Sequence, residues 1–163
     1  MTPEPARSGF RFEKSRADAV LTLAGGETIR GYFFVAGSPS HEGPERVAEL
    51  LNSEAGFFPF EIEHDGTPRT VLYNRSHLIF VEVTGHEERA EPGHPVAKPR
   101  EVSLMLSNGH RLDGVVRIHR PEGRDRLSDW SRQPEPFRYL ETADVTLIVN
   151  ATHIVAITEV QGQ

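Results

Sequence analysis

The sequence of 163 residues contains no cysteine, which excludes disulfide bonds, thiolate metal ligands and a cysteine nucleophile. It contains no apolar run that approaches the roughly 18 residues of a transmembrane helix. Residues 1–9 are polar and proline-containing and lack the apolar core of a signal peptide. From these absences we expect a soluble, cytoplasmic protein that does not contact a membrane.

Positive charge is also scarce. The chain has 18 lysine and arginine residues against 24 aspartate and glutamate residues, which gives a formal net charge of −6. Nucleic acids are usually bound by basic surfaces, because their phosphates must be neutralised. The charge balance therefore weighs against nucleic acid as the main partner, although it does not exclude a local basic surface.

The motifs of common catalytic and cofactor sites are missing. The sequence has no nucleophile elbow, no phosphate-binding loop and no dinucleotide-binding glycine pattern. Gly25-Gly26 is followed by a strand pattern and so predicts a hairpin turn. The 8 histidines include no His-x-His or His-Glu-x-x-His spacing. We therefore expect a non-catalytic protein with no cofactor and no metal.

One stretch of the chain occurs twice. Residues 72–83 read LYNRSHLIFVEV, and residues 148–159 read IVNATHIVAITE. Each copy is an apolar strand, an Asn-x-Ser/Thr-His turn and a second apolar strand. Because each copy also closes a block of similar order, we interpret the chain as a tandem duplication.

Both blocks predict the same order of elements. Two alternating strands flank a glycine turn, a short helix follows over 46–52 or 126–130, and a third strand precedes the repeated stretch. Gly31 and Gly114 fall at matching places in the second strand and predict a bend or a close backbone approach. The expected boundaries are an N-terminal arm at 1–18, a first repeat at 19–84, a linker at 85–99 without structure of its own, and a second repeat at 100–163.

Three aromatic residues of the second block are predicted to be core. Trp130 takes the place of Leu50, and Phe137-Arg138-Tyr139 is matched with Phe58-Pro59-Phe60. An exposed stacking platform is the alternative for Trp130, Phe137 and Tyr139.

The order of short strands, the glycine in the bent second strand and the tight turn before the last strand resemble the Sm-like family, which includes the bacterial Hfq protein. The stretch Tyr73-Asn74-Arg75-Ser76-His77 is similar to the tyrosine-lysine-histidine turn of that protein. The resemblance implies two tandem five-stranded small barrels, and the short helix predicted in each block is then an insert in its barrel. It also implies assembly by pairing of the fourth strand of one barrel with the fifth strand of the next, into a closed ring of chains.

A second resemblance concerns the helical insert, which the Sm-like pattern does not include. The segment Arg126-Leu127-Ser128-Asp129, followed by Val149-Asn150, resembles a group of uncharacterised bacterial proteins with an Arg-Leu-Ser-Asp … Val-Asn motif.

The duplicated turns supply the main candidate site. The family resemblance implies that turn residues bind RNA, and the candidates are Asn74, Arg75, His77, Asn150 and His153. The structural interpretation is that Asn74 and Asn150 adopt a positive φ, that Ser76 and Thr152 cap the turn, and that the histidines bond backbone carbonyls. Ala151 replaces Arg75 in the second copy, so a phosphate contact is available in one repeat only.

A basic loop is the second candidate surface. It comprises Arg117, His119, Arg120, Arg124 and Arg126. Such a loop can bind phosphates or an acidic partner, whereas the interspersed acidic residues favour a solvated loop.

The sequence thus predicts a mainly β protein of two Sm-like barrels. The expected function is non-catalytic binding or assembly, with a protein partner or self-association. RNA binding through the turns is the alternative.

Overall fold

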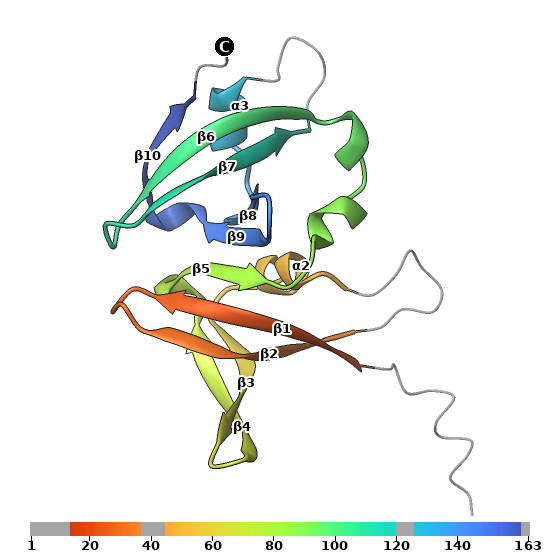
Figure 1. Ribbon diagram of the computed structural model, residues 1–163, viewed down its shortest axis with the longest axis vertical. Coiled ribbons are helices and arrows are strands. Elements are labelled where there is room, and N and C mark those ends of the chain that lie inside the picture. The colour runs from red at the N-terminus through yellow and green to blue at the C-terminus, as the bar shows by residue number, and fades with distance from the viewer. Residues whose placement is uncertain (1–13, 37–44, 120–125, 161–163) are drawn as a thin grey trace, which may run out of the picture.

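The computed structural model describes residues 14–36, 45–119 and 126–160 (Figure 1). In these ranges the protein is mainly β, as predicted: ten antiparallel strands form one open sheet, and the helices are few and short. None of the helices in the described ranges is long and apolar enough to cross a membrane.

The strands divide into two halves of equal strand number. The N-terminal half contains β1 (Lys14–Leu23), β2 (Thr28–Ala36), α2 (Val47–Asn52), β3 (Phe57–His64), β4 (Thr67–Asn74), the 3-10 turn η1 (Arg75–His77) and β5 (Leu78–Val83). The C-terminal half contains β6 (Lys98–Leu106), β7 (Arg111–Ile118), α3 (Leu127–Ser131), β8 (Phe137–Glu141), β9 (Thr146–Asn150), the 3-10 turn η4 (Ala151–His153) and β10 (Ile154–Glu159).

Both halves use the same strand order. The sheet runs β10-β6-β7-β8-β9-β5-β1-β2-β3-β4, so each half follows the order fifth, first, second, third, fourth. The halves meet where β5 pairs with β9, and Figure 1 shows these two strands facing each other between the halves. The strands β4 and β10 lie at the two ends of the sheet.

A glycine in the second strand of each half permits a close approach to the third strand. A Cβ at Gly31 would overlap the carbonyl oxygen of Glu61 on β3. A Cβ at Gly114 would lie 2.6 Å from the carbonyl oxygen of Glu141 on β8. Only glycine fits such an approach, so the close approach predicted at these two positions is confirmed.

Each half has a hydrophobic core. The N-terminal core is rich in aromatic residues: Phe33 lies 5.7 Å from Phe58 and 4.9 Å from Phe60, measured between ring centroids. The C-terminal core is mostly aliphatic, and Trp130 on α3 is buried in it. Trp130 is therefore a core residue, as predicted.

The expected match between the third strands is wrong by one residue. Phe137 lies opposite Asn150, whereas the residue opposite Asn74 is Phe57. Phe137 therefore corresponds to Phe57, and Tyr139 corresponds to Pro59. A shift of one residue exchanges the two faces of a strand, so the predicted equivalence of Phe137 to the core residue Phe58 does not hold, although Phe137 itself is buried.

Two expected boundaries also differ from the structure. β1 begins at Lys14 and pairs with β2 from there, so residues 14–18 belong to the sheet and not to an arm. The expected linker holds two 3-10 turns, η2 (Glu87–Ala90) and η3 (His94–Val96), and is ordered by contacts with both halves. Glu88 and His94 in it are buried, because Thr146 and Glu141 of the C-terminal half provide their polar partners.

Candidate functional site: the junction and the two sheet ends

The β5–β9 ladder joins the two cores. Val81 lies opposite Ile148, and both are fully buried in the N-terminal core. Phe80 on β5 lies opposite Val149 on β9, and both point to the other face and pack in the C-terminal core, in which Ile79 near the start of β5 is also buried. Because side chains alternate along a strand, each of the two strands contributes to both cores.

Phe137 packs the start of β8 against α2. Its side chain is buried in the N-terminal core. The Asn52 amide donates to the Phe137 carbonyl oxygen at 2.9 Å, and the Phe137 N–H donates to the Asn52 Oδ1 at 2.9 Å. A side-chain amide that satisfies both groups of one backbone residue fixes the position of that residue in the junction.

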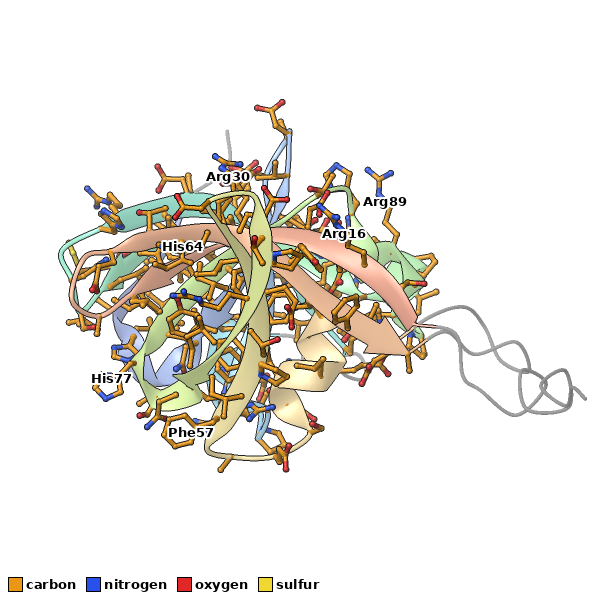
Figure 2. All side chains as sticks on the ribbon, turned by 90° about the horizontal axis from the view of Figure 1, so that it is seen from below. Arg16, Arg30, Phe57, His64, His77 and Arg89 are labelled. Carbon is orange, nitrogen blue, oxygen red and sulfur yellow. The ribbon has the colours of Figure 1, made fainter. Side chains whose placement is uncertain are left out.

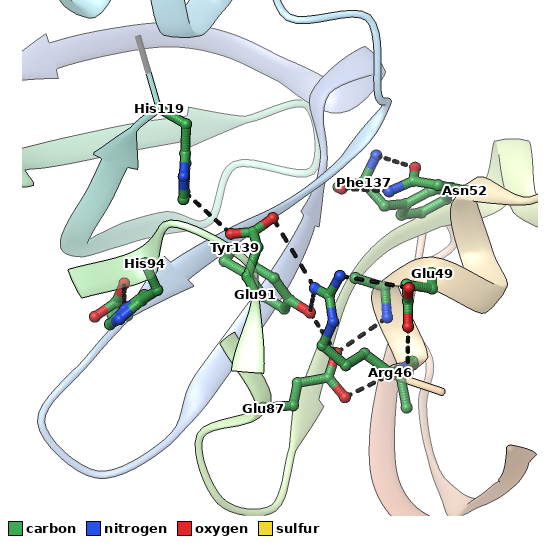
Figure 3. A network of polar contacts seen from close by, with 12 residues as sticks. Arg46, Glu49, Asn52, Glu87, Glu91, His94, His119, Phe137 and Tyr139 are labelled. Atoms are coloured by element: carbon green, nitrogen blue, oxygen red, sulfur yellow. Dashed lines mark hydrogen bonds and ion pairs between the residues drawn. The ribbon is translucent and has the colours of Figure 1, made fainter. Parts of the chain in front are cut away.

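A polar network covers the same junction (Figure 3). The Arg46 guanidinium donates to the Tyr139 hydroxyl at 2.8 Å, and this hydroxyl donates to the Glu87 carboxylate at 2.8 Å. The Glu87 carboxylate also accepts from the N–H groups of Val47 and Ala48, which are free at the start of α2. Burial, together with the nearby Glu87 carboxylate, raises the pKa of Tyr139. The Tyr139 hydroxyl therefore keeps its proton and links the side chains of Arg46 and Glu87. We do not expect it to act as an acid or a base.

The two duplicated turns have nearly the same backbone. Asn74 and Asn150 have φ values of −84° and −80°, so the expected positive φ is wrong. Each asparagine caps its own 3-10 turn, because its Oδ1 accepts from the N–H of Ser76 or Thr152 at 3.0 Å. Ser76 and Thr152 were predicted to cap the turns, and this is wrong: Asn74 and Asn150 are the caps, and Ser76 and Thr152 donate their backbone N–H groups to them.

The turn of the C-terminal half also contacts the N-terminal half. The Asn150 Nδ2 donates to the carbonyl oxygens of Arg75 and Leu78, at 3.3 and 2.9 Å. His153 Nε2 lies 2.7 Å from the Ser76 carbonyl oxygen and Nδ1 lies 2.7 Å from the Ser107 hydroxyl. A carbonyl only accepts, so Nε2 carries a proton. The predicted histidine–carbonyl bond is confirmed for His153.

Arg75 has a structural role. Its side chain donates to the carbonyl oxygens of Leu51 at 2.8 Å, Phe57 at 2.7 Å and Leu50 at 3.0 Å, and the residue is buried. Burial lowers its pKa. The guanidinium closes the C-terminal end of α2 and is not presented to a phosphate in this conformation.

His77 is the exposed member of the candidate turn set. Figure 2 shows its ring directed outward at the same end of the molecule as Phe57. The structure therefore separates the five turn candidates: Arg75 and Asn150 are buried, Asn74 and His153 are half-buried, and His77 is exposed.

The expected basic loop is largely paired where it is described. Arg117 forms an ion pair with Glu141 at 2.8 Å, and His119 lies 3.1 Å from the Glu91 carboxylate. Arg126 is exposed beside α3. Arg120 and Arg124 lie outside the described residues.

A polar cavity of about 540 Å³ lies beside the junction, and its walls carry both signs of charge: Arg46, Glu91, Arg117, His119, Tyr139 and Glu141. Next to it, ligand atoms of Glu88, His94 and Glu141 lie within 4.8 Å of one another. Thr146 contacts Glu88, and both His94 and Arg117 contact Glu141. These protein partners make the cluster an internal polar network that ties the linker to β8 and β9.

The sheet ends differ from the junction in the exposure of their apolar residues. At the β4 end, Phe57 and Leu72 are exposed. At the other end a groove of about 440 Å³, here called the β10 groove, lies between α3 and β10 and is lined by Leu127, Ser128, Ser131, Ile154, Val155 and Ile157. None of these apolar end residues was selected from sequence, although aligning the two copies of the duplicated stretch would have paired Leu72 with Ile148.

Comparison with models of known protein families, with curated proteins and with solved structures gave no match for this chain.

Proposed function

We propose that this is a non-catalytic binding and assembly protein whose two open sheet ends are its binding surfaces. The observation that carries the proposal is the contrast between the ends and the junction. All residues of β9 are buried at the junction, whereas its counterpart at the end of the sheet, β4, is mostly exposed. An unpaired edge strand offers backbone N–H and C=O groups to another strand.

The proposal includes two tandem Sm-like barrels as the source of these surfaces. Support comes from the equal strand order of the halves, the glycine in each second strand and the fourth-to-fifth pairing of β9 with β5. On this basis a closed ring of several chains is the expected assembly.

RNA binding through the turns is the alternative function. His77 and the half-buried Asn74 remain accessible to a base, whereas the Arg75 side chain donates to four carbonyl oxygens. A binding site for RNA at this turn therefore depends on stacking and base contacts and has little phosphate neutralisation.

Native mass spectrometry of the purified protein, prepared without nuclease, tests the proposal. A bare complex of a whole number of chains supports assembly. A heterogeneous nucleic-acid increment on the protein mass contradicts the proposal in favour of RNA binding. In that case a loss of RNA binding in His77→Ala, at unchanged stability, would assign the turn as the site.

A further inference from the structure

Three side chains of the metal-ligating types come together where the linker meets the C-terminal half. Glu88 on η2, His94 on η3 and Glu141 on β8 each offer one ligand atom, and these atoms lie within 4.8 Å of one another. Glu88 is 1% exposed, His94 is 9% exposed, and the Glu141 side chain is 16% exposed. Sequence spacing does not reveal this cluster, because His94 and Glu141 are 47 residues apart.

The negative charge of the cluster is only partly balanced by basic side chains. Arg117 forms an ion pair with Glu141 at 2.8 Å. Within the part of the chain that the structure describes, the ion-pair partner of Glu88 is His86, at 3.4 Å, and neither lysine nor arginine pairs with Glu88. While the histidines are neutral, the cluster therefore holds one buried carboxylate charge without a cation. Burial of such a charge is unfavourable, and a bound cation removes this cost.

We propose that Glu88, His94 and Glu141 bind a divalent transition-metal ion, and that zinc is the ion that these ligands suit. Zinc is commonly bound by imidazole nitrogen and carboxylate oxygen, whereas calcium and magnesium prefer oxygen ligands alone. Ligand atoms around a tetrahedral zinc ion lie about 3.3 Å apart. His94 Nε2 lies 3.2 Å from Glu141 Oε2, close to that spacing (His94 in Figure 3). This inference goes beyond the proposed binding and assembly function and does not depend on it.

Neighbouring side chains hold both carboxylates in place. The Thr146 hydroxyl donates to Glu88 Oε1, and Arg117 Nε donates to Glu141 Oε2 at 2.8 Å. Metal-binding carboxylates in proteins are typically oriented by hydrogen bonds of this kind. His86 Nδ1 lies 3.4 Å from Glu88 Oε2 and 3.1 Å from the Thr146 hydroxyl, so His86 is close enough to supply a fourth ligand.

A metal ion at this place connects the linker to both halves of the molecule. Glu88 and His94 belong to the linker, and Glu141 belongs to β8 of the C-terminal half. Glu87, the neighbour of Glu88 in the chain, accepts from two backbone N–H groups at the start of α2 in the N-terminal half. The ion therefore has a structural role: it binds the folded chain, in which the ligands are assembled, and so stabilises the junction.

Titration of the metal-free full chain with zinc, followed by isothermal titration calorimetry, tests the inference. One zinc ion per chain is expected, and the thermal unfolding temperature should rise with zinc concentration. Glu88→Gln keeps the shape of the side chain and an oxygen for the Thr146 hydroxyl, but it removes the charge. Its zinc affinity should fall at least about tenfold. Without zinc, the variant should be no less stable than the wild type, because the unbalanced charge is gone.

His119→Gln is the matched control. His119 lies 3.1 Å from the Glu91 carboxylate, beside the cluster but not part of it, so its loss should leave zinc affinity unchanged. His94→Gln should lose affinity as Glu88→Gln does, and circular dichroism checks that each variant is folded. Nuclear magnetic resonance of the imidazole nitrogens of the wild type needs no substitution of a ligand. In this measurement zinc should shift the Nε2 signal of His94 and leave the signals of His119 in place.

Two results would overturn the inference. The first is a wild-type chain that binds no zinc. The second is equal zinc affinity in the wild type, Glu88→Gln and His94→Gln, or an unchanged His94 signal, because zinc then binds to other histidines. Both results leave the proposed assembly through the sheet ends intact, since that proposal is tested by the mass of the complexes formed without added metal.

Discussion

The two copies of the Asn-x-Ser/Thr-His turn have the same local structure and different surroundings. In both, the asparagine Oδ1 accepts from the backbone N–H two residues later at 3.0 Å. Asn150 additionally reaches two carbonyl oxygens of the N-terminal half, whereas Asn74 lies at an end of the sheet. The difference shows that local sequence determines the turn, whereas the place of the turn in the sheet determines which of its groups are buried.

The largest contrast is expected between the two equivalent phenylalanines. Phe137→Ala removes a buried ring from the N-terminal core and should lower the free energy of unfolding by about 3–5 kcal/mol. Phe57→Ala removes an exposed ring and should change it by about 0.5 kcal/mol or less when the protein is dilute. Urea denaturation at low protein concentration measures both. Similar losses for the two variants would show that Phe57 is packed in solution.

Arg75 distinguishes the first turn from the second, where alanine stands. Arg75→Ala leaves the carbonyl oxygens of Leu50, Leu51 and Phe57 without this donor and should cost roughly 3 kcal/mol. Arg69→Ala, on the exposed face of β4, is the matched control and should cost roughly 0.5 kcal/mol or less. Thermal unfolding compares them. If Arg75→Ala left the stability unchanged, the guanidinium would not be bound to these carbonyl oxygens in solution, and a phosphate-binding role would again be possible.

The two asparagines should differ by a smaller amount. Asn74→Ala loses a cap, at a cost of about 1 kcal/mol. Asn150→Ala loses the same cap and leaves two buried carbonyl oxygens without this donor, so the cost should reach about 2–3 kcal/mol. Equal losses from the two variants, measured by urea denaturation, would mean that the contacts between the halves contribute nothing beyond the cap.

The smallest effect is expected at Tyr139, whose counterpart Pro59 has no hydroxyl. Tyr139→Phe removes one hydroxyl between Arg46 and Glu87 and should cost about 1 kcal/mol near neutral pH. Burial raises the pKa of Tyr139. Above pH about 10 the unfolded chain loses this proton and the folded chain keeps it, so stability falls as pH rises. The variant should lose less stability than the wild type between pH 9 and 11; parallel profiles would place the Tyr139 hydroxyl in solvent.

Much of the fold could be predicted from period-two patterns and from the duplicated stretch. The turn glycines, the close approaches at Gly31 and Gly114 and the burial of Trp130 all follow from residues that are close in sequence. The one-residue error at Phe137 has a physical cause: Phe57-Phe58 offers two adjacent aromatic residues, and sequence alone does not say which faces the core. The end of the arm was missed because residues 14–18 carry three charged side chains, Lys14, Arg16 and Asp18, and extend β1 beyond the buried region.

The candidate surfaces were harder to predict for a different reason. Leu72 and Ile148 are similar residues in equivalent strands, and only the pairing of β9 with β5 makes one buried and leaves the other exposed. The role of Arg75 depends likewise on the end of α2 coming close to the turn, a contact between segments distant in the chain. Local sequence patterns predict neither the exposure of Leu72 nor the contact of Arg75 with α2.

The shared strands of the junction also affect how the chain folds as it is synthesised. β5 leaves the ribosome well before β9, and Ile79 has no core to enter until the C-terminal half exists. During that interval the nascent N-terminal half presents an unpaired edge and an apolar groove beside α2, a state that favours pairing with the wrong strand. We expect the isolated N-terminal half to aggregate or to recruit a chaperone, and the complete chain to unfold in a single cooperative transition.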